Sequence, residues 1–177
     1  MATTHPDSTS ASSARPLLVV MGVSGCGKST AAEAIASRVG VRYADGDGFH
    51  PDTNLAKMRA GSPLTDDDRW PWLDEIGAWL ATYSDEGAVV ACSALRRAYR
   101  DRLRAAAPRT SFLHLAGPRE VVQRRLDARS DHFMPPSLLQ SQYDTLEPLH
   151  DDEAGVTIDL DLPVPVIVEQ YLSQEAQ

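Results

Sequence analysis

Cysteine is scarce in this chain, whose 177 residues include only Cys26 and Cys92. One lies in a glycine-rich segment and the other at the end of an apolar run, so the two do not suggest a disulfide framework. We therefore expect a protein of a reducing compartment, the cytoplasm. An excess of positive charge is also missing, because the formal net charge is −8. This balance argues against a general nucleic-acid binder, so any anionic ligand has to be held by local groups.

Long apolar runs and a targeting segment are absent as well. No run approaches the roughly 20 residues that a helix needs to cross a bilayer, which excludes a membrane protein. Residues 1–16 are rich in Ser, Thr and Ala and lack the basic start and apolar stretch of a secretory signal. We expect a disordered tail at 1–16 and a single domain at 17–177.

What the chain does contain is a segment of fixed spacing, Gly22 to Ser29, directly after the apolar run Leu17–Met21. It fits G-x-x-x-x-G-K-[ST], a phosphate-binding loop, and a buried strand before it and a helical pattern after it are the context that this loop requires. Its glycines let successive backbone N–H groups turn toward an anion. Lys28 can reach the β and γ phosphates, and the Ser29 hydroxyl can bind Mg²⁺. The alternative is a glycine-rich turn with a chance Lys-Ser pair.

Two carboxylates follow the second predicted strand, Val41–Ala44. Asp45 and Asp47 lie in a turn-forming segment at the carboxyl end of this strand, where open α/β sheets bind ligands. One carboxylate can hold Mg²⁺, directly or through water, while the other takes the proton of an attacking hydroxyl. We take Ser29 and Asp45 as metal ligands and Asp47 as the base, although the pattern alone also allows the reverse for the two aspartates. A solvated Asp-Gly turn is the alternative.

Cationic and aromatic residues follow this turn. Lys57 lies on a short predicted helix, 52–59, and Arg69 follows an acidic triplet that is typical of a helix cap. The rings of Trp70 and Trp72 could line a pocket, and an apolar helical pattern runs from Trp72 to Tyr83.

A third buried strand, 88–92, delivers Ser93 to the same sheet edge as the phosphate loop. Arg96, Arg97 and Arg100 lie in the first turns of the next helix, and at least one of them is close enough to the cleft to bind an anionic acceptor. Solvated surface arginines are the alternative.

Arginines also mark a helix predicted from Gly117 to about Ser130, where Arg125 and Arg129 share one face at i, i+4. A proline-broken loop and a helix over about 137–146 follow. We interpret residues 124–140 as a lid whose guanidinium groups cover the transferred phosphate when it closes and exclude water. The expected catalytic residues are Lys28, Asp47, Arg125 and Arg129. The residues expected to bind ATP are Gly22, Val23, Ser24, Gly25, Cys26, Gly27, Lys28, Ser29, Thr30 and Arg125.

Two further strands, at 112–116 and 156–160, and a closing helix over 164–172 complete the chain. Five strands that alternate with helices predict an α/β fold, with a five-stranded parallel sheet sandwiched by helices, of the P-loop type. These features together support direct, in-line phosphoryl transfer from a nucleoside triphosphate to a small acceptor, which they do not identify.

Several spaced motifs resemble those of the thermoresistant-type gluconokinase family, which are P-loop kinases related to shikimate and nucleoside-monophosphate kinases. They are D-G-D-x-x-H-P at 45–51, N-x-x-K-M at 54–58, G-x-P-L-x-D-x-D-R-x-P-W-L at 61–73, C-S-A-L-[KR]-R-x-Y-R-D at 92–101 and H-F-M-P at 132–135. The resemblance runs from about Leu17 to Gln170, with each motif in the expected order.

This resemblance implies an ATP- and Mg²⁺-dependent kinase that phosphorylates the 6-hydroxyl of D-gluconate, a cytosolic homodimer that feeds the pentose phosphate pathway. By similarity, Gly22 to Ser29 would bind ATP, and Asp47 or Asp45 would orient the sugar-acid hydroxyl. Gluconate carries one carboxylate and a row of hydroxyls, so its pocket needs a cation and polar partners. The candidates for this pocket are Asp47, His50, Lys57, Arg69, Ser93, Arg97 and His132.

Position 26 carries Cys where the family more often has Ser or a similarly small residue, and a thiol in the phosphate loop suggests sensitivity to thiol reagents. Two other functions stay open. The chain could phosphorylate another small acceptor, such as shikimate or a nucleoside monophosphate. It could instead be a non-catalytic ATP-binding module whose partner recognises an open or closed lid.

Overall fold

The centre of the molecule is a parallel sheet, seen in a computed structural model that describes residues 15–129 and 136–175. Its strands are β1 (Leu17–Met21), β2 (Arg42–Asp45), β3 (Ala88–Ala91), β4 (Ser111–Ala116) and β5 (Gly155–Asp159). They are arranged in the order β2-β3-β1-β4-β5, and every neighbouring pair is parallel. The predicted five-stranded parallel sheet is confirmed.

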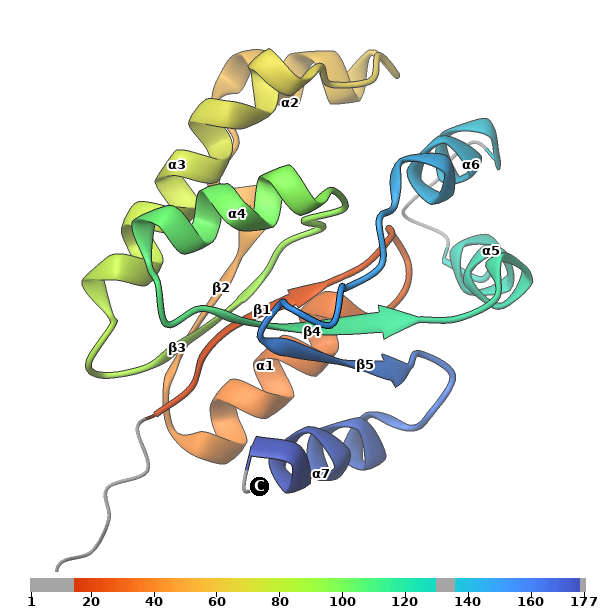
Figure 1. The fold of residues 1–177 in the computed structure, drawn as a ribbon. Coiled ribbons are helices and arrows are strands. Elements are labelled where there is room, and N and C mark those ends of the chain that lie inside the picture. The colour runs from red at the N-terminus through yellow and green to blue at the C-terminus, as the bar shows by residue number, and fades with distance from the viewer. Residues whose placement is uncertain (1–14, 130–135, 176–177) are drawn as a thin grey trace, which may run out of the picture.

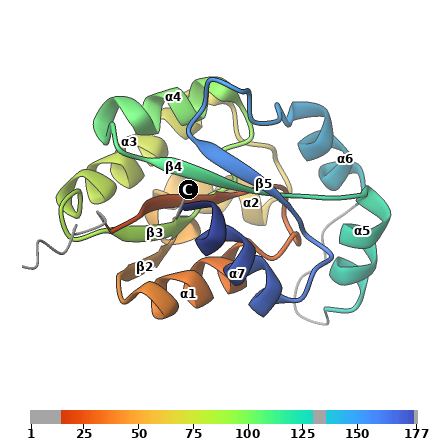
Figure 2. The same ribbon diagram turned by 60° about the horizontal axis from the view of Figure 1, so that its bottom comes forward.

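Helices cover both faces of the sheet (Figures 1 and 2). One face carries α1 (Lys28–Val39) and α7 (Val164–Glu175), and the other carries α3 (Asp66–Thr82) and α4 (Arg97–Ala106). A 3₁₀ helix, η1 (Gly46–Phe49), follows β2 and leads into α2 (Asp52–Arg59). The two remaining helices, α5 (Arg119–Asp127) and α6 (Pro136–Thr145), lie beyond the carboxyl end of β4 (Figure 1).

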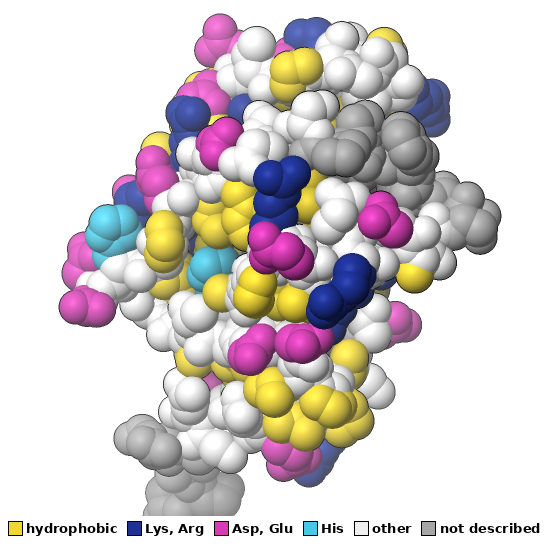
Figure 3. Space-filling model, turned by 90° about the vertical axis from the view of Figure 1, so that its right-hand side faces the viewer, with side chains coloured by type: hydrophobic (Ala, Val, Ile, Leu, Met, Phe, Trp, Pro, Cys, Tyr) yellow, Lys and Arg dark blue, Asp and Glu magenta, His cyan; other side chains and the backbone are white. Residues whose placement is uncertain are grey.

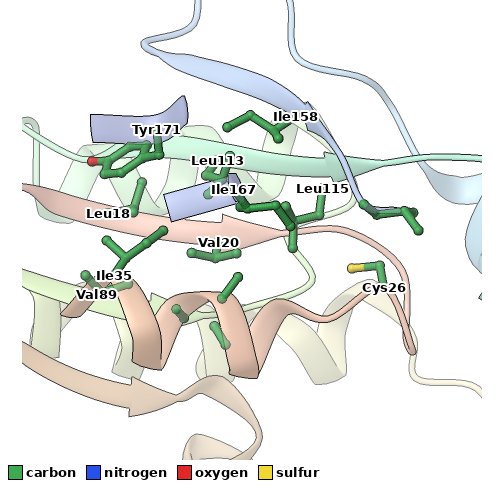
Figure 4. Close-up of a cluster of buried hydrophobic side chains, with 14 of the residues drawn as sticks. Leu18, Val20, Cys26, Ile35, Val89, Leu113, Leu115, Ile158, Ile167 and Tyr171 are labelled. Atoms are coloured by element: carbon green, nitrogen blue, oxygen red, sulfur yellow. The ribbon is translucent and has the colours of Figure 1, made fainter. Parts of the chain in front are cut away.

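Alternating side chains of the strands form two cores. On β1, Leu18 and Val20 belong to the cluster with α1 and α7, part of which Figure 4 shows. Leu17, Val19 and Met21 belong to the cluster with α3 and α4. Burial on both faces is usual for parallel strands, because crossover helices cover each side. It holds the carboxyl ends of β1, β2 and β3 firmly side by side, which is where the predicted site residues lie.

Two of the helix boundaries that differ from the sequence prediction bear on the site. The third helix begins at Asp66 rather than at Trp72, because Thr65 and Asp68 form a capping box: the Asp68 N–H donates to Thr65 Oγ1, and the Thr65 N–H donates to Asp68 Oδ2. The fifth helix ends at Asp127 rather than near Ser130, in a tight turn where the Arg129 N–H donates to the Leu126 carbonyl. Arg129 therefore lies past the helix and does not share a helical face with Arg125.

Of the tail predicted over 1–16, residues 1–14 lie outside the described ranges, and residues 15 and 16 are bonded to the domain. The Pro16 carbonyl accepts a hydrogen bond from the Ala88 N–H at 2.9 Å, and the Arg15 carbonyl accepts one from Arg109 at 3.1 Å. These bonds attach the segment before β1 to the body of the domain. Among the helices of the described ranges, none combines the length and the apolar character needed to span a bilayer.

Candidate active site

The segment Gly22–Ser29 joins β1 to α1 at the carboxyl end of the sheet, and two of its glycines are required by close contacts. Gly25 has φ of 80°, and a Cβ there would lie 2.7 Å from the Leu126 side chain. At Gly22, with φ of 143°, a Cβ would lie 2.9 Å from the Leu115 carbonyl oxygen. Since α1 begins at Lys28, its N-terminus follows the loop directly. Loop N–H groups and a helix N-terminus together favour an anion.

Two cations lie against this loop. Lys28 Nζ donates to the Val23 carbonyl at 2.9 Å. Arg125 on α5 donates to the Cys26 carbonyl at 3.3 Å and to the Leu160 carbonyl at 2.8 Å. The predicted ATP-binding arginine is therefore placed between the phosphate loop and the turn after β5. Arg129, predicted to act with it, is exposed.

The aspartates after β2 have different surroundings. Asp45 accepts hydrogen bonds from Ser29 Oγ at 2.7 Å and from the Asp47 N–H at 3.0 Å, and Tyr43 Oη lies at 3.4 Å. Asp47 is exposed on η1, and no side chain of the described residues donates to its carboxylate. The Trp72 indole N–H donates to the Gly46 carbonyl at 2.7 Å and so fixes the turn that carries Asp47. Asp45 is thus joined to the phosphate loop, while Asp47 is free to meet another molecule.

The Ser29 hydroxyl and the Asp45 carboxylate suit Mg²⁺, which prefers oxygen ligands and usually takes one or two from the protein together with phosphate oxygens and water. Their 2.7 Å separation allows both to contact one ion. Within residues 15–129 and 136–175, no group of three or more His, Cys, Asp or Glu side chains could hold a metal. A magnesium ion at this point would therefore need ligands from another molecule, such as the oxygens of a triphosphate.

His50 stacks on Trp72, with ring centroids 4.3 Å apart and an interplanar angle of 13°. Burial lowers the pKa of His50, and the positive charge of Arg69 adds to this effect, while the nearby Asp47 carboxylate opposes it. Asn54 Nδ2 lies 3.3 Å from His50 Nδ1. The His50 ring is thus fixed in position and uncharged near neutral pH, which suits a hydrogen bond with a hydroxyl.

The predicted acceptor-binding cations are paired with carboxylates in the first turn of α3. Lys57 Nζ contacts the two Asp68 carboxylate oxygens at 2.7 and 2.8 Å. This bond, together with the hydrogen bonds from Thr65, lowers the pKa of Asp68 to about 2. Arg69 and Arg96 each lie 3.3 Å from Asp66. An anionic acceptor would have to share these cations with Asp66 and Asp68.

Arg97 and Ser93 are placed differently from each other. The Arg97 guanidinium binds Asp101 at 2.9 Å and Asp152 at 2.9 and 3.0 Å, so the chain already supplies carboxylates for it. As an acceptor ligand, Arg97 is the candidate that the geometry supports least. The Ser93 carbonyl accepts a hydrogen bond from the Gly22 N–H at 3.2 Å, which places Ser93 beside the phosphate loop as predicted.

Sequence reasoning missed an ion pair behind this site. Arg100 and Glu153 are fully buried, with Nε–Oε1 and Nη2–Oε2 distances of 2.6 and 2.9 Å. Arg100 also donates to the Ala94 carbonyl at 3.1 Å, where Ala94 has a positive φ of 42°. The arginine was recognised as a candidate ligand, but no local pattern connects it with a glutamate 53 positions away.

Two other site predictions need comment. Cys26 is 1% exposed and belongs to the core cluster, so the expected sensitivity of the loop to thiol reagents is contradicted by burial (Figure 4). His132 lies outside the described residues.

The surface over α5 and α6 carries charges of both signs. Figure 3 looks onto this side of the molecule, where Lys and Arg side chains lie beside Asp and Glu side chains across the middle of the face. Hydrophobic side chains lie next to them. The face thus has no uniform positive field, and an anion that binds there would need individual basic groups.

Comparison with known proteins agrees with this geometry. The shikimate kinase family model matches residues 24–174. The chain is 43% identical to the gluconokinase of Gluconobacter oxydans, covering 88% of each chain. It is 40% identical to the thermoresistant gluconokinase of Escherichia coli, covering 86% of this chain and 89% of the relative. The crystal structure of a gluconokinase from Sinorhizobium meliloti superposes with a TM-score of 0.85 at 48% identity, covering 92% and 93%. The chain belongs to the gluconokinase family of shikimate kinase-like P-loop kinases.

Proposed function

We propose that this protein is an ATP-dependent gluconokinase, which converts D-gluconate and ATP to 6-phospho-D-gluconate and ADP. The observation that carries the proposal is the hydrogen bond between Ser29 and Asp45 at the phosphate loop, with the Asp47 carboxylate two residues further on, exposed and without a side-chain donor among the described residues. This arrangement brings residues suited to a phosphate site, a metal site and a base together at the carboxyl ends of β1 and β2. The identity of the acceptor is inferred from the family to which the chain belongs.

The transfer is direct. As the 6-hydroxyl oxygen forms a bond to the γ phosphorus, the bond from phosphorus to the β–γ bridging oxygen breaks, and Asp47 takes the hydroxyl proton. Lys28 and Arg125, each of which donates to a carbonyl of the loop, neutralise charge on the phosphates. Arg129 and His132 belong to the proposal as residues that complete the site when the lid closes. Bound through Ser29 and Asp45, Mg²⁺ would add further charge neutralisation on the phosphate oxygens.

The acceptor lies over η1 and the start of α3. Lys57 and Arg69 supply positive charge for the gluconate carboxylate, and His50 and Ser93 supply polar contacts for its hydroxyls. Arg97 stays in this set only if substrate displaces Asp152, since Asp101 and Asp152 bind it in the structure. Because both cysteines are free and buried, a reducing cytoplasm suits the chain, and we keep the cytosolic homodimer as part of the proposal.

The test is ADP formation, measured by a coupled assay with gluconate, shikimate, AMP and a panel of sugar acids. We expect turnover with gluconate and a product whose phosphorus signal couples to the protons of carbon 6. Faster turnover with shikimate or AMP would overturn the choice of acceptor. Tight ATP binding without turnover on any of these acceptors would favour a non-catalytic module.

A further inference from the structure

We propose that Arg69 and Arg96 together bind the carboxylate of the acceptor, and that Tyr99 positions both guanidinium groups through Asp66. The inference rests on the proposed function and deepens it, because it assigns the residues that bind one end of the substrate. Of the arginines at the start of α4, it selects Arg96 as the one that contacts the acceptor. We call these four residues the Tyr99 cluster.

The cluster is built around the ring of Tyr99, which is 2% exposed. The guanidinium carbon of Arg69 lies 5.5 Å from the ring centroid, and that of Arg96 lies 6.0 Å from it. Trp70 packs edge-on against the same ring, with centroids 5.6 Å apart. Cations at this distance are attracted to the electron-rich face of an aromatic ring. The ring thus supports both guanidinium groups.

Asp66 joins the two arginines. Tyr99 Oη donates a hydrogen bond to Asp66 Oδ1, and Arg69 Nη1 donates to the same oxygen at 3.3 Å and to Tyr99 Oη at 3.2 Å. Arg96 Nη1 donates to the other oxygen, Asp66 Oδ2, at 3.3 Å. The hydrogen bond from Tyr99, and then the charges of Arg96 and Arg69, lower the pKa of Asp66. Asp66 is therefore a charged carboxylate with one oxygen on each guanidinium.

The charges of the Tyr99 cluster do not balance. Two guanidinium groups face one carboxylate, which leaves one positive charge. Arg69 and Arg96 use only Nη1 in these bonds, and their other guanidinium N–H groups donate to no acceptor within residues 15–129 and 136–175. Their side chains are 25% and 44% exposed, so a ligand can reach them. A second carboxylate would balance the charge and accept from the unused N–H groups.

Neighbouring arginines of α4 are arranged differently. Arg97 binds Asp101 and Asp152 through three of its nitrogens. Arg102 binds the two oxygens of Asp74 at 2.7 and 2.8 Å. The chain thus supplies each of these arginines with at least one carboxylate of its own. In the Tyr99 cluster, by contrast, two arginines share a single carboxylate.

The cluster lies close to the other groups proposed for the acceptor. The charge of Arg69 acts on His50 and helps to lower its pKa, and the Asp47 carboxylate acts on the same ring. Arg96 comes shortly after Ser93, which lies beside the phosphate loop. The carboxylate and the 6-hydroxyl are at opposite ends of gluconate. A carboxylate site in the cluster therefore leaves the 6-hydroxyl to extend toward Asp47 and the phosphate loop.

Tyr99 acts through the arginines rather than on the acceptor. Its single O–H is donated to Asp66 and its ring is buried, so it has no hydrogen to donate to a substrate. Held by this bond, Asp66 cannot turn to form a two-bonded pair with one arginine, which would remove that arginine from the acceptor. Tyr99 is therefore a positioning residue.

The first test is Arg96→Met, measured by steady-state kinetics. KM for gluconate should rise by about 10- to 100-fold and KM for ATP should stay the same, because a charge-assisted contact with the acceptor is lost. Arg102→Met is the matched control. Its side chain is equally exposed and also lies over a ring, that of Trp70, but its guanidinium already binds Asp74. An unchanged KM in Arg96→Met, or an equal rise in both variants, overturns the inference.

The second test is Tyr99→Phe, which keeps the ring and removes the hydroxyl. In a variant that melts like wild type, KM for gluconate should rise by about tenfold while kcat and KM for ATP stay the same. In the Arg96→Met background, the same change should raise KM by only about two- to threefold, because coupled residues are not additive. Effects that multiply, or a KM that rises equally for ATP and gluconate, overturn the positioning role. A wild-type protein without turnover on gluconate would instead overturn the proposed function.

Discussion

The two halves of the site use different chemical groups: one relies on the backbone and the other on side chains. On the proposed nucleotide side, the groups expected to face a ligand are mostly backbone N–H groups, in a loop that joins β1 to α1 between two buried cores. On the acceptor side, they are side chains of η1, α2, the first turn of α3 and the start of α4. These side chains already form a network among themselves, with Lys57 on Asp68 and both Arg69 and Arg96 on Asp66.

This difference predicts different responses to change. A backbone site is preorganised by the fold, so a substitution affects it only by disturbing the glycines or the core beneath them. A side-chain network can exchange partners. When an anionic acceptor binds, the cationic side chains contact it in place of some of their bonds to carboxylates of the chain. We therefore expect single substitutions to alter acceptor use more than nucleotide affinity.

The largest effect should come from Asp47, whose carboxylate is exposed and accepts no hydrogen bond from a side chain of the described residues. Asp47→Asn removes the proposed base while keeping the size of the side chain. Turnover on gluconate should fall by about 10² to 10⁴-fold, with little change in ATP affinity. Steady-state kinetics at saturating substrates measures it. Asp67→Asn, an exposed change in the first turn of α3, is the control, and near wild-type turnover by Asp47→Asn would show that the role is wrong.

The free energy of unfolding should fall most when the buried ion pair between the two halves of the site is changed. Arg100 on α4 and Glu153 before β5 are both fully buried, and Arg100 also binds the chain directly after Ser93. Burial alone would raise the pKa of Glu153, but the hydrogen bonds from Arg100 and the His150 N–H outweigh it and lower this pKa. Glu153→Gln leaves a buried guanidinium without its counterion, and we expect a loss of about 3–5 kcal/mol in the free energy of unfolding.

Urea denaturation measures this loss. Asp152→Asn removes a carboxylate that is exposed and binds Arg97, so its effect should be much smaller. Equal losses of unfolding free energy in Glu153→Gln and Asp152→Asn would mean that the buried ion pair contributes no more to stability than the exposed one.

The stability of the protein should depend on pH through His114, a residue close to the phosphate loop. This residue lies opposite Met21 in the register of β4 and β1, and it lines a cavity of about 210 Å³ together with Val23 of the phosphate loop. Burial, and then the positive charge of Arg100, lower its pKa to about 4. The unfolded chain binds a proton at this residue near pH 6.5, whereas the folded one does so only near pH 4. The folded state is therefore penalised as the pH falls between these values.

The penalty from His114 should reach about 3 kcal/mol at pH 4. We expect the stability difference between His114→Leu and wild type to shift by this amount in favour of the variant between pH 7 and pH 4. Urea unfolding at several pH values measures it. A difference that stays constant over this range would contradict the assigned pKa.

These contrasts also explain what could be predicted from the sequence. The loop over Gly22–Ser29 depends on local requirements of the backbone, and the left-handed C-cap at Gly40 follows from the same kind of signal. The central strands β1, β3 and β4 were predictable because buried parallel strands are nearly continuous apolar runs, whereas the edge strands β2 and β5 are partly exposed and carry a weaker signal. Each of these features is encoded within a few neighbouring residues.

The rest depends on partners that are distant in sequence. Arg97 was predicted as a ligand, yet Asp152, 55 positions away, binds it. Gln142 on α6 resembles any polar residue of a helix in the sequence, yet its side chain accepts a hydrogen bond from the Ser24 N–H, 118 positions away, at 2.7 Å. Cys26 was expected to be reactive because its loop faces a ligand, but its own side chain points into the core. Side-chain pairing of this kind leaves no periodic signal in the chain.

The smallest effect tests the side-chain network directly. Lys57 lies on α2 beside Asp68, so Lys57→Met removes a cation from the acceptor side and leaves Arg69 in place. We expect KM for gluconate to rise by about tenfold while KM for ATP stays the same, because one charge-assisted contact is lost and the backbone site is untouched. Arg59→Met, an exposed change in the last turn of the same helix, controls for loss of charge alone. Equal changes for both variants would mean that general charge attracts gluconate, whereas a rise confined to Lys57→Met would place the carboxylate of the acceptor at the start of α3.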